Sequence, residues 1–129
     1  MEKLNLKVLK VKLKLNVIAD KPTVNGRIYS REILENALSR NKTFSIVLDK
    51  PQRPEIKLRN VIATTKSYEI NDEGEVFIFI DKIINKTLGE ILKLDILLGI
   101  CSLGTVKEKF VQGFHIISFY PILKDEVST

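Results

Sequence analysis

Apolar and polar side chains alternate along the start of the chain. Between residues 3 and 18 the alternation has a period of two, which predicts a strand with one buried face. The phase changes once, at Val8 and Leu9, so we expect a β-bulge or a bend there. After this change the polar face carries Lys10, Lys12 and Lys14. Two interpretations stay open: the lysines guard an exposed strand against aggregation, or they form a docking face for an acidic partner.

A turn and then a helix follow this strand. Asn25 and Gly26 both tolerate a positive φ, which is typical of a turn. Ser30 stands where an N-cap is expected, and Glu32 in the first turn suits the helix dipole. The helix is predicted to run to about Arg40. Its apolar stripe is Ile33, Leu34, Ala37 and Leu38. We expect this stripe to reach a core that contains Ile78, Ile80, Leu92 and Ile96.

The middle of the chain is rich in strand-forming residues. Residues 43–48 predict a short buried strand, and the two prolines of residues 49–54 forbid regular structure after it. Residues 61–70 and 76–84 predict two strands. The Asn-Asp-Glu-Gly sequence of residues 71–74 predicts a hairpin turn between them.

The last third of the chain predicts a second helix and two strands. Thr87 and Glu90 have the spacing of a capping box, and Gly99 is expected to end the helix that they open. Strands are predicted from residue 100 and over residues 110–123. The order β-α-β-β-β-α-β-β indicates an α+β fold. We expect one domain over residues 1–129, a small and mostly antiparallel β-barrel or sheet flanked by two helices.

The amino-acid identities of residues 25–37 are more specific than their pattern of apolar and polar positions. They read Asn-Gly-Arg-Ile-Tyr-Ser-Arg-Glu-Ile-Leu-Glu-Asn-Ala. This segment resembles the Asn-Gly-Arg-x-Tyr-(Pro/Ser)-x-x-x-Leu-x-x-Ala sequence near the N-terminus of the prohead maturation proteases of tailed phages. These proteins are serine peptidases with an assemblin-like fold, related to that of the herpesvirus proteases. The resemblance implies the same fold, and a location in the virion, or in the host cytoplasm during assembly.

A serine peptidase needs a nucleophile, a base and donors for the oxyanion. The resemblance places the histidine base in an Asp-His-Pro-like loop, which corresponds here to Asp49-Lys50-Pro51. Lys50 therefore stands in place of the histidine. A lysine acts as a base only where burial favours its neutral form, and nothing in this loop predicts burial.

The resemblance places the nucleophile in a Gly-Val-Ser-Ser-Arg-Gly-like strand, which corresponds to residues 99–104. This strand contains Cys101 and Ser102, and either could match the family serine; the family arginine is Leu103. A cysteine nucleophile would also need a base. We expect the positions Lys50, Cys101 and Ser102 to be vestigial, with no catalytic residue.

The rest of the composition excludes several kinds of chemistry. The one histidine, His115, is expected in a strand beside Ile117 and Phe119, partly buried and structural. A histidine-rich metal site is excluded, and neither a metal nor a cofactor is expected. The one cysteine, Cys101, allows no internal disulfide, which fits a reducing cytoplasm.

Charge and hydropathy limit the partners. The net charge is +5, but the chain has no tryptophan, no arginine cluster and no nucleic-acid-binding motif, so we expect no nucleic-acid partner. No apolar run reaches the ~18 residues of a membrane span, and no signal-peptide layout is expected.

Taken together, the sequence predicts a catalytically inactive relative of a prohead protease. It would have a structural role in the virion or in head assembly, binding capsid or other virion proteins or further copies of itself, with Lys10, Lys12 and Lys14 as a candidate contact surface. The alternative is a divergent but active maturation protease that uses Ser102 or Cys101.

Overall fold

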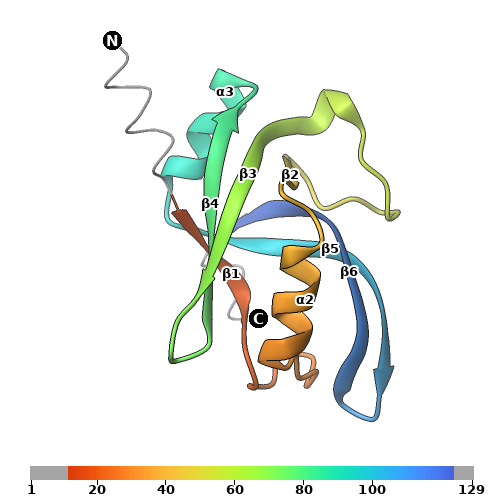
Figure 1. The fold of residues 1–129 in the computed structure, drawn as a ribbon. Helices are drawn as coiled ribbons and strands as arrows, with labels where there is room; N and C mark the ends of the chain where they lie inside the picture. The colour runs from red at the N-terminus through yellow and green to blue at the C-terminus, as the bar shows by residue number, and fades with distance from the viewer. Residues whose placement is uncertain (1–11, 124–129) are drawn as a thin grey trace.

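Six strands close into a small barrel in the computed structural model, which describes residues 12–123 (Figure 1). The strand order around the barrel is β1-β4-β3-β2-β6-β5. The pairs β1–β5 and β2–β6 are parallel, and the other pairs are antiparallel. The elements are β1 (Lys12–Ile18), α2 (Arg31–Ser39), β2 (Ser45–Val47), the 3₁₀ turn η1 (Leu58–Asn60), β3 (Val61–Ile70), β4 (Glu75–Ile83), α3 (Lys86–Gly89), the 3₁₀ turn η2 (Glu90–Lys93), β5 (Ile96–Lys107) and β6 (Phe110–Leu123). The expected α+β class and mostly antiparallel barrel are confirmed.

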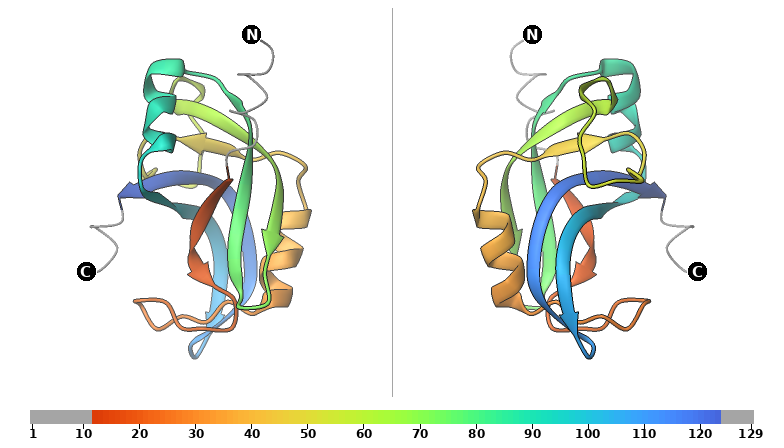
Figure 2. Two further views of the ribbon diagram at one scale, coloured as in Figure 1. Left: turned by 90° about the vertical axis from the view of Figure 1, so that its left-hand side faces the viewer. Right: turned by 90° about the vertical axis from the view of Figure 1, so that its right-hand side faces the viewer.

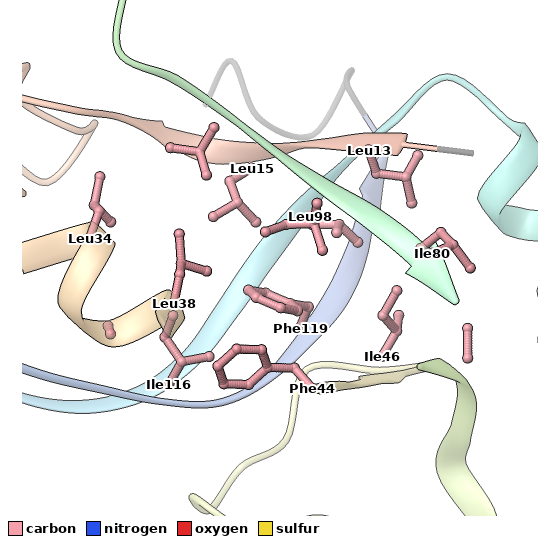
Figure 3. Close-up of a cluster of buried hydrophobic side chains, with 14 of the residues drawn as sticks. Leu13, Leu15, Leu34, Leu38, Phe44, Ile46, Ile80, Leu98, Ile116 and Phe119 are labelled. Atoms are coloured by element: carbon pink, nitrogen blue, oxygen red, sulfur yellow. The ribbon is translucent and has the colours of Figure 1, made fainter. Parts of the chain in front are cut away.

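The helix α2 forms where the sequence predicts it. The Oγ atom of Ser30 accepts a hydrogen bond from the backbone N–H of Ile33 at 3.1 Å, which satisfies a donor that the first turn leaves unpaired. The stripe of α2 turns into the barrel, where Leu38 lies toward Phe119 and Leu34 lies further along the helix (Figure 3). The predicted core is confirmed, because one buried cluster contains Leu34, Ala37, Leu38, Ile78, Ile80, Leu92 and Ile96.

The hairpin β3–β4 is also confirmed, and its turn is fixed by one side chain. The Oδ1 atom of Asn71 accepts hydrogen bonds from the backbone N–H groups of Glu73 and Glu75, at 3.0 and 2.9 Å. Gly74 has a φ of +85°. A Cβ there would lie 2.8 Å from the carbonyl oxygen of Ala19, so the turn requires a glycine for its backbone angle and for its packing on the end of β1.

The prediction of the second helix is largely wrong. It was expected from Thr87 to Gly99, but α3 has only four residues and is followed by η2. Its cap is Asn85, whose Oδ1 atom accepts from the N–H of Leu88 at 3.1 Å, so Thr87 is not the cap. The following leucine-rich residues belong to β5, and Gly99 lies inside that strand.

Barrel closure explains this difference. Leu98 is fully buried and pairs in parallel with Leu15 of β1, which joins the two ends of the sheet. Continuous pairing with β6 begins at Ile96. A helix over residues 96–99 would leave the barrel open, so long-range strand pairing overrides the local helical pattern.

The first strand is described from residue 12. Leu13 and Leu15 are buried, as the alternation predicts. The expected phase change at Val8 and Leu9 lies outside the described residues. Within residues 12–123, no helix is long and apolar enough to cross a membrane.

Candidate functional site

A surface depression lies where the turn before α2, the segment after β2 and the strand β5 meet. Its volume is about 280 Å³. We name it the Ser102 depression; its polar lining residues are Asn16, Thr23, Asn25, Arg27, Tyr29, Lys50, Ser102 and Tyr120. The turn before α2 projects from the barrel beside the β5–β6 hairpin in both views of Figure 2. β1, the turn before α2, the segment after β2, β5 and β6 therefore all contribute to one site.

The Asn25–Gly26 turn is confirmed and tightly held. The N–H of Gly26 donates to the carbonyl of Thr23, and the N–H of Thr23 donates to the carbonyl of Arg27, both at 2.8 Å. Gly26 has a φ of +81°. Next to the turn, Ile28 donates to the carbonyl of Lys109 at 2.7 Å. The loop that carries Thr23, Asn25 and Arg27 is thus anchored to the β5–β6 hairpin.

Lys50 is exposed and lines the Ser102 depression, a second depression beside it, and a third that it shares with Asp49, Arg53 and Glu55. The second has a volume of about 220 Å³ and is lined by residues 50–54 and 100–103. The segment after β2 therefore passes beside the middle of β5, as the right-hand view of Figure 2 also shows. The structure brings Lys50 together with Cys101 and Ser102, the three positions that the sequence singled out.

A β-bulge separates the two candidate nucleophile positions. Cys101 pairs with Ser118 of β6, but Ser102 pairs with Ile116, so Ile117 has no partner on β5. Consecutive strand residues point to opposite faces. Ser102 lines both depressions, whereas Cys101 lines only the second of them. Ser102 therefore shares a depression with both Lys50 and Arg27, whereas Cys101 shares one with Lys50 but not with Arg27.

The same bulge explains why the expectation for His115 is wrong. His115 is exposed, not partly buried, and its Nδ1 atom lies 3.4 Å from Nη1 of Arg40. Simple alternation would put His115 and Phe119 on one face. The extra residue Ile117 reverses the phase, so Phe119 turns into the core and His115 stays outside. His115 lines neither depression.

Tyr120 is a residue of this site that the sequence interpretation missed. Gly99 is its partner on β5, and a Cβ at Gly99 would overlap the Tyr120 ring. Burial raises the pKa of the Tyr120 phenol, and the neighbouring Cys101 thiol adds to this effect. The phenol therefore remains a hydrogen-bond donor at neutral pH. The only sequence signal was a glycine within an apolar strand, which marks a close approach of another group.

The expected lysine face is partly occupied by contacts within the barrel. The Nζ atom of Lys12 lies 4.7 Å from the centroid of the Phe77 ring, and Lys14 forms an ion pair with Glu75. Lys10 lies outside the described residues. Lys12 and Lys14 thus bind side chains of β4, and their role in docking stays a prediction.

The hydrogen-bond donors that line the two depressions are either cationic or uncharged side chains. No carboxylate lines either depression. Among residues 12–123, no group of three or more His, Cys, Asp or Glu residues could hold a metal ion. Comparison with protein-family models, with curated proteins and with solved structures finds no match for the chain. The fold and the site define a small closed barrel with a basic, hydroxyl-lined surface depression.

Proposed function

We propose that the chain is a catalytically inactive, assemblin-like relative of the prohead maturation proteases of tailed phages. Its role is structural: it binds capsid or other virion proteins in the virion or during head assembly. The observation that carries the proposal is that Lys50 and Ser102 line the same depression. Lys50 is exposed there and stands where the family has a histidine.

The convergence of distant residues supports the family assignment. Asn25, Arg27 and Tyr29 belong to the segment that resembles the prohead proteases, and all three line the Ser102 depression. Lys50 corresponds to the family base position, and Ser102 is one of the two candidates, with Cys101, for the nucleophile position. These three parts of the chain were identified from sequence resemblance alone. A chance resemblance would not predict that they lie together in space.

The chemistry of the site supports the absence of peptidase activity. A serine hydroxyl becomes a nucleophile when a neighbouring base takes its proton. The burial that turns a lysine into a base is absent at Lys50. His115 lies outside the depression, and Cys101 would need the same missing base.

One observation favours a second candidate, a divergent and active maturation protease. Lys50 and Ser102 share a depression, and a serine–lysine pair is a known variant of the catalytic arrangement. Activity would require the segment 50–54 to close over β5 and bury the Lys50 ammonium.

A peptidase assay distinguishes the two candidates. Purified protein is incubated with capsid and scaffold proteins, and separately with a serine-directed fluorophosphonate. We expect intact substrates and no labelled residue. Ser102→Ala, Cys101→Ala and the control Ser39→Ala, an exposed serine of α2, should all assemble like the wild type. Stoichiometric labelling of Ser102, or cleavage that Ser102→Ala or Lys50→Ala abolishes, would overturn the structural role.

The fate of the protein in particles tests the structural role itself. A structural component should persist intact and in fixed stoichiometry in mature particles, whereas a maturation protease is commonly cleaved and lost. Mass spectrometry of purified mature particles measures both properties, and absence of the protein from them would contradict the proposal.

A further inference from the structure

The strand β3 loses its neighbour on one side partway along its length. β2 has only three residues, and its pairing with β3 covers residues 61–64. One more bond, from the N–H of Thr65 to the carbonyl of Phe44 at 2.9 Å, ends this side of the ladder. From residue 66 on, no described strand other than β4 pairs with β3. Because alternate residues of an antiparallel strand turn their N–H and C=O groups away from a given neighbour, residues 66–69 present an unpaired edge.

The helix α2 stands beside this edge without covering all of it. α2 lies between β3 and β6 and packs mainly on β6 (Figure 1). At the far end of the edge, Nη2 of Arg31 donates to the carbonyl of Asn71 at 2.7 Å. Closer to residue 66, a hollow of about 200 Å³ lies between the last turn of α2 and β3. Helix and strand therefore form two walls of this hollow.

The floor of the hollow is mostly apolar. We name it the Tyr68 hollow, after the half-buried tyrosine in its lining; its buried lining residues are Leu38, Phe44, Thr65 and Ile78. The Oγ1 atom of Thr65 already accepts a hydrogen bond from the N–H of Phe44 at 3.1 Å. The volume is below the roughly 300–1,000 Å³ of pockets that hold whole small molecules. It suits a single large apolar side chain of a partner.

The charged residues at the rim of the Tyr68 hollow are both cations. Lys42 and Lys66 line it and are exposed, and its described lining contains no acidic residue. Neither lysine belongs to one of the ion pairs of residues 12–123. Glu69, further along β3, does not line the hollow. The rim therefore favours an acidic group beside the two lysines rather than at the Glu69 end.

A β-bulge places Lys66 at this rim. Thr65 pairs with Ile80 of β4, and Ser67 pairs with the adjacent Phe79, so Lys66 has no partner on β4. Bulges redirect side chains and are common at sheet edges and beside functional sites. A bulge and a lysine also protect an edge from unwanted strand pairing. Protection alone does not require an apolar hollow next to the edge.

We propose that the Tyr68 hollow and the adjoining edge of β3 dock an extended segment of another protein, in which an acidic residue stands beside a large apolar one. The segment adds a strand along residues 66–69 and places its apolar side chain in the hollow, with the acidic residue beside Lys42 and Lys66. Main-chain hydrogen bonds supply affinity, while the hollow and the lysines select the sequence. The site shares no residue with the Ser102 depression, so this inference goes beyond the proposed function and does not depend on it.

The test is a titration of ¹⁵N-labelled protein, followed by amide chemical shifts. The probe is an acetylated hexapeptide of threonines with a leucine and a glutamate side by side at its centre. We expect saturable shifts at residues 39–44 and 65–69. A peptide with alanine in place of leucine should bind at least about tenfold more weakly, because it buries less apolar surface. A peptide with glutamine in place of glutamate should also bind more weakly, and this difference should shrink at high salt.

Two further probes test whether the ligand binds as a strand. One is a pair of peptides methylated on alternate amide nitrogens, each of which lacks the donors along one of its edges. We expect one member of the pair to lose binding. The other probe is 4-methylpentanoate, which has the apolar group and the carboxylate without a peptide backbone. Equal binding of 4-methylpentanoate, or undiminished binding of both methylated peptides, would overturn the docking of a strand.

Variants of the protein locate the site. Ser39→Trp fills the Tyr68 hollow from α2 and should abolish binding, whereas the control Asn36→Trp puts the same ring at an exposed position of α2 outside the hollow. Lys42→Gln/Lys66→Gln should weaken binding of the glutamate peptide but not of the glutamine peptide. Equal effects of the two tryptophans, or shifts that spread over the surface without saturation, would overturn the site.

The outcomes also separate this inference from the proposed function. Absence of peptide binding in a protein that persists in mature particles would remove the docking site and leave the structural role standing. The bulge and Lys66 would then only guard the edge of β3. Peptide binding by a protein whose Ser102 is labelled by a fluorophosphonate would do the reverse, because the docking site would stand and the structural role would not.

Discussion

The ring of Tyr120 lies directly over the backbone of Gly99, its partner on the neighbouring strand. A Cβ at Gly99 would overlap the ring and come within 2.8 Å of Ile122 Cδ1. Gly99 is therefore required by packing rather than by a turn. The contact sets the position of the phenol at the edge of the Ser102 depression.

Replacing Gly99 by alanine should displace this ring. The variant Gly99→Ala should lower the free energy of unfolding by about 1–3 kcal/mol, the usual cost of overpacking. Urea denaturation measures it. In the double variant Gly99→Ala/Tyr120→Ala the alanine methyl occupies space that the ring has left, so the two costs should be less than additive. Fully additive costs would contradict the contact.

The buried stripe of α2 should contribute strongly to stability. Leu34 is fully buried, so Leu34→Ala should cost about 2–5 kcal/mol, because it removes apolar contacts and leaves a cavity. The neighbouring Glu35 is exposed, and Glu35→Ala should change the free energy by less than about 0.5 kcal/mol. Equal melting temperatures for both variants would mean that α2 does not pack on the barrel.

The ion pair of Lys14 and Glu75 should make stability depend on pH. Lys14, and to a smaller extent Asn71, lowers the pKa of the Glu75 carboxyl from its usual 4.5. Because the folded-state pKa lies below the unfolded-state value, the contribution is complete above the usual value and is lost as the pH falls through the folded-state value.

Thermal unfolding of Glu75→Gln measures this contribution. At pH 7 the variant should melt below the wild type, and the difference should shrink as the pH falls below about 4.5. The control Glu73→Gln removes an exposed carboxylate of the same turn and should melt like the wild type. A difference that persists unchanged at low pH would show that charge is not its cause.

The lysines of the first strand remain a predicted contact surface for an acidic partner. A glutamate at residue 14 would repel Glu75, so glutamine is the appropriate replacement. The triple variant Lys10→Gln/Lys12→Gln/Lys14→Gln should stay folded and enter particles less efficiently. Its difference from the wild type should shrink at high salt, because salt screens the attraction that the wild-type lysines supply. A triple variant at Lys82, Lys86 and Lys93 is the matched control. Normal incorporation of the first variant would assign its lysines to protection of the strand.

Local chemistry explains which elements the sequence could predict. Ser30 caps α2 and Asn71 fixes the β3–β4 turn through hydrogen bonds to residues two to four positions away, so a short segment contains the whole interaction. The second helix failed for the opposite reason. Whether residues 96–99 form a strand depends on Leu15, more than eighty positions earlier, which no local pattern contains.

The sequence predicted some residues of the candidate site but not their arrangement in space. Sequence resemblance alone identified Lys50 and Ser102, and the barrel places both in one depression. Tyr120 could not be found in this way, since its place in the site depends on Gly99 of the neighbouring strand. The environment of His115 failed because the bulge at Ile117 leaves no sequence signature in an apolar run.

The closure of the barrel through Leu15 and Leu98 has a consequence for the order of folding. The strand β1 is synthesised first, but its partners are β4 and β5, so it has no sheet neighbour until most of the chain has left the ribosome. Contacts of such long sequence separation slow folding and leave an apolar strand unpaired meanwhile. Of the two interpretations of the lysines in this strand, protection against aggregation would act during that interval.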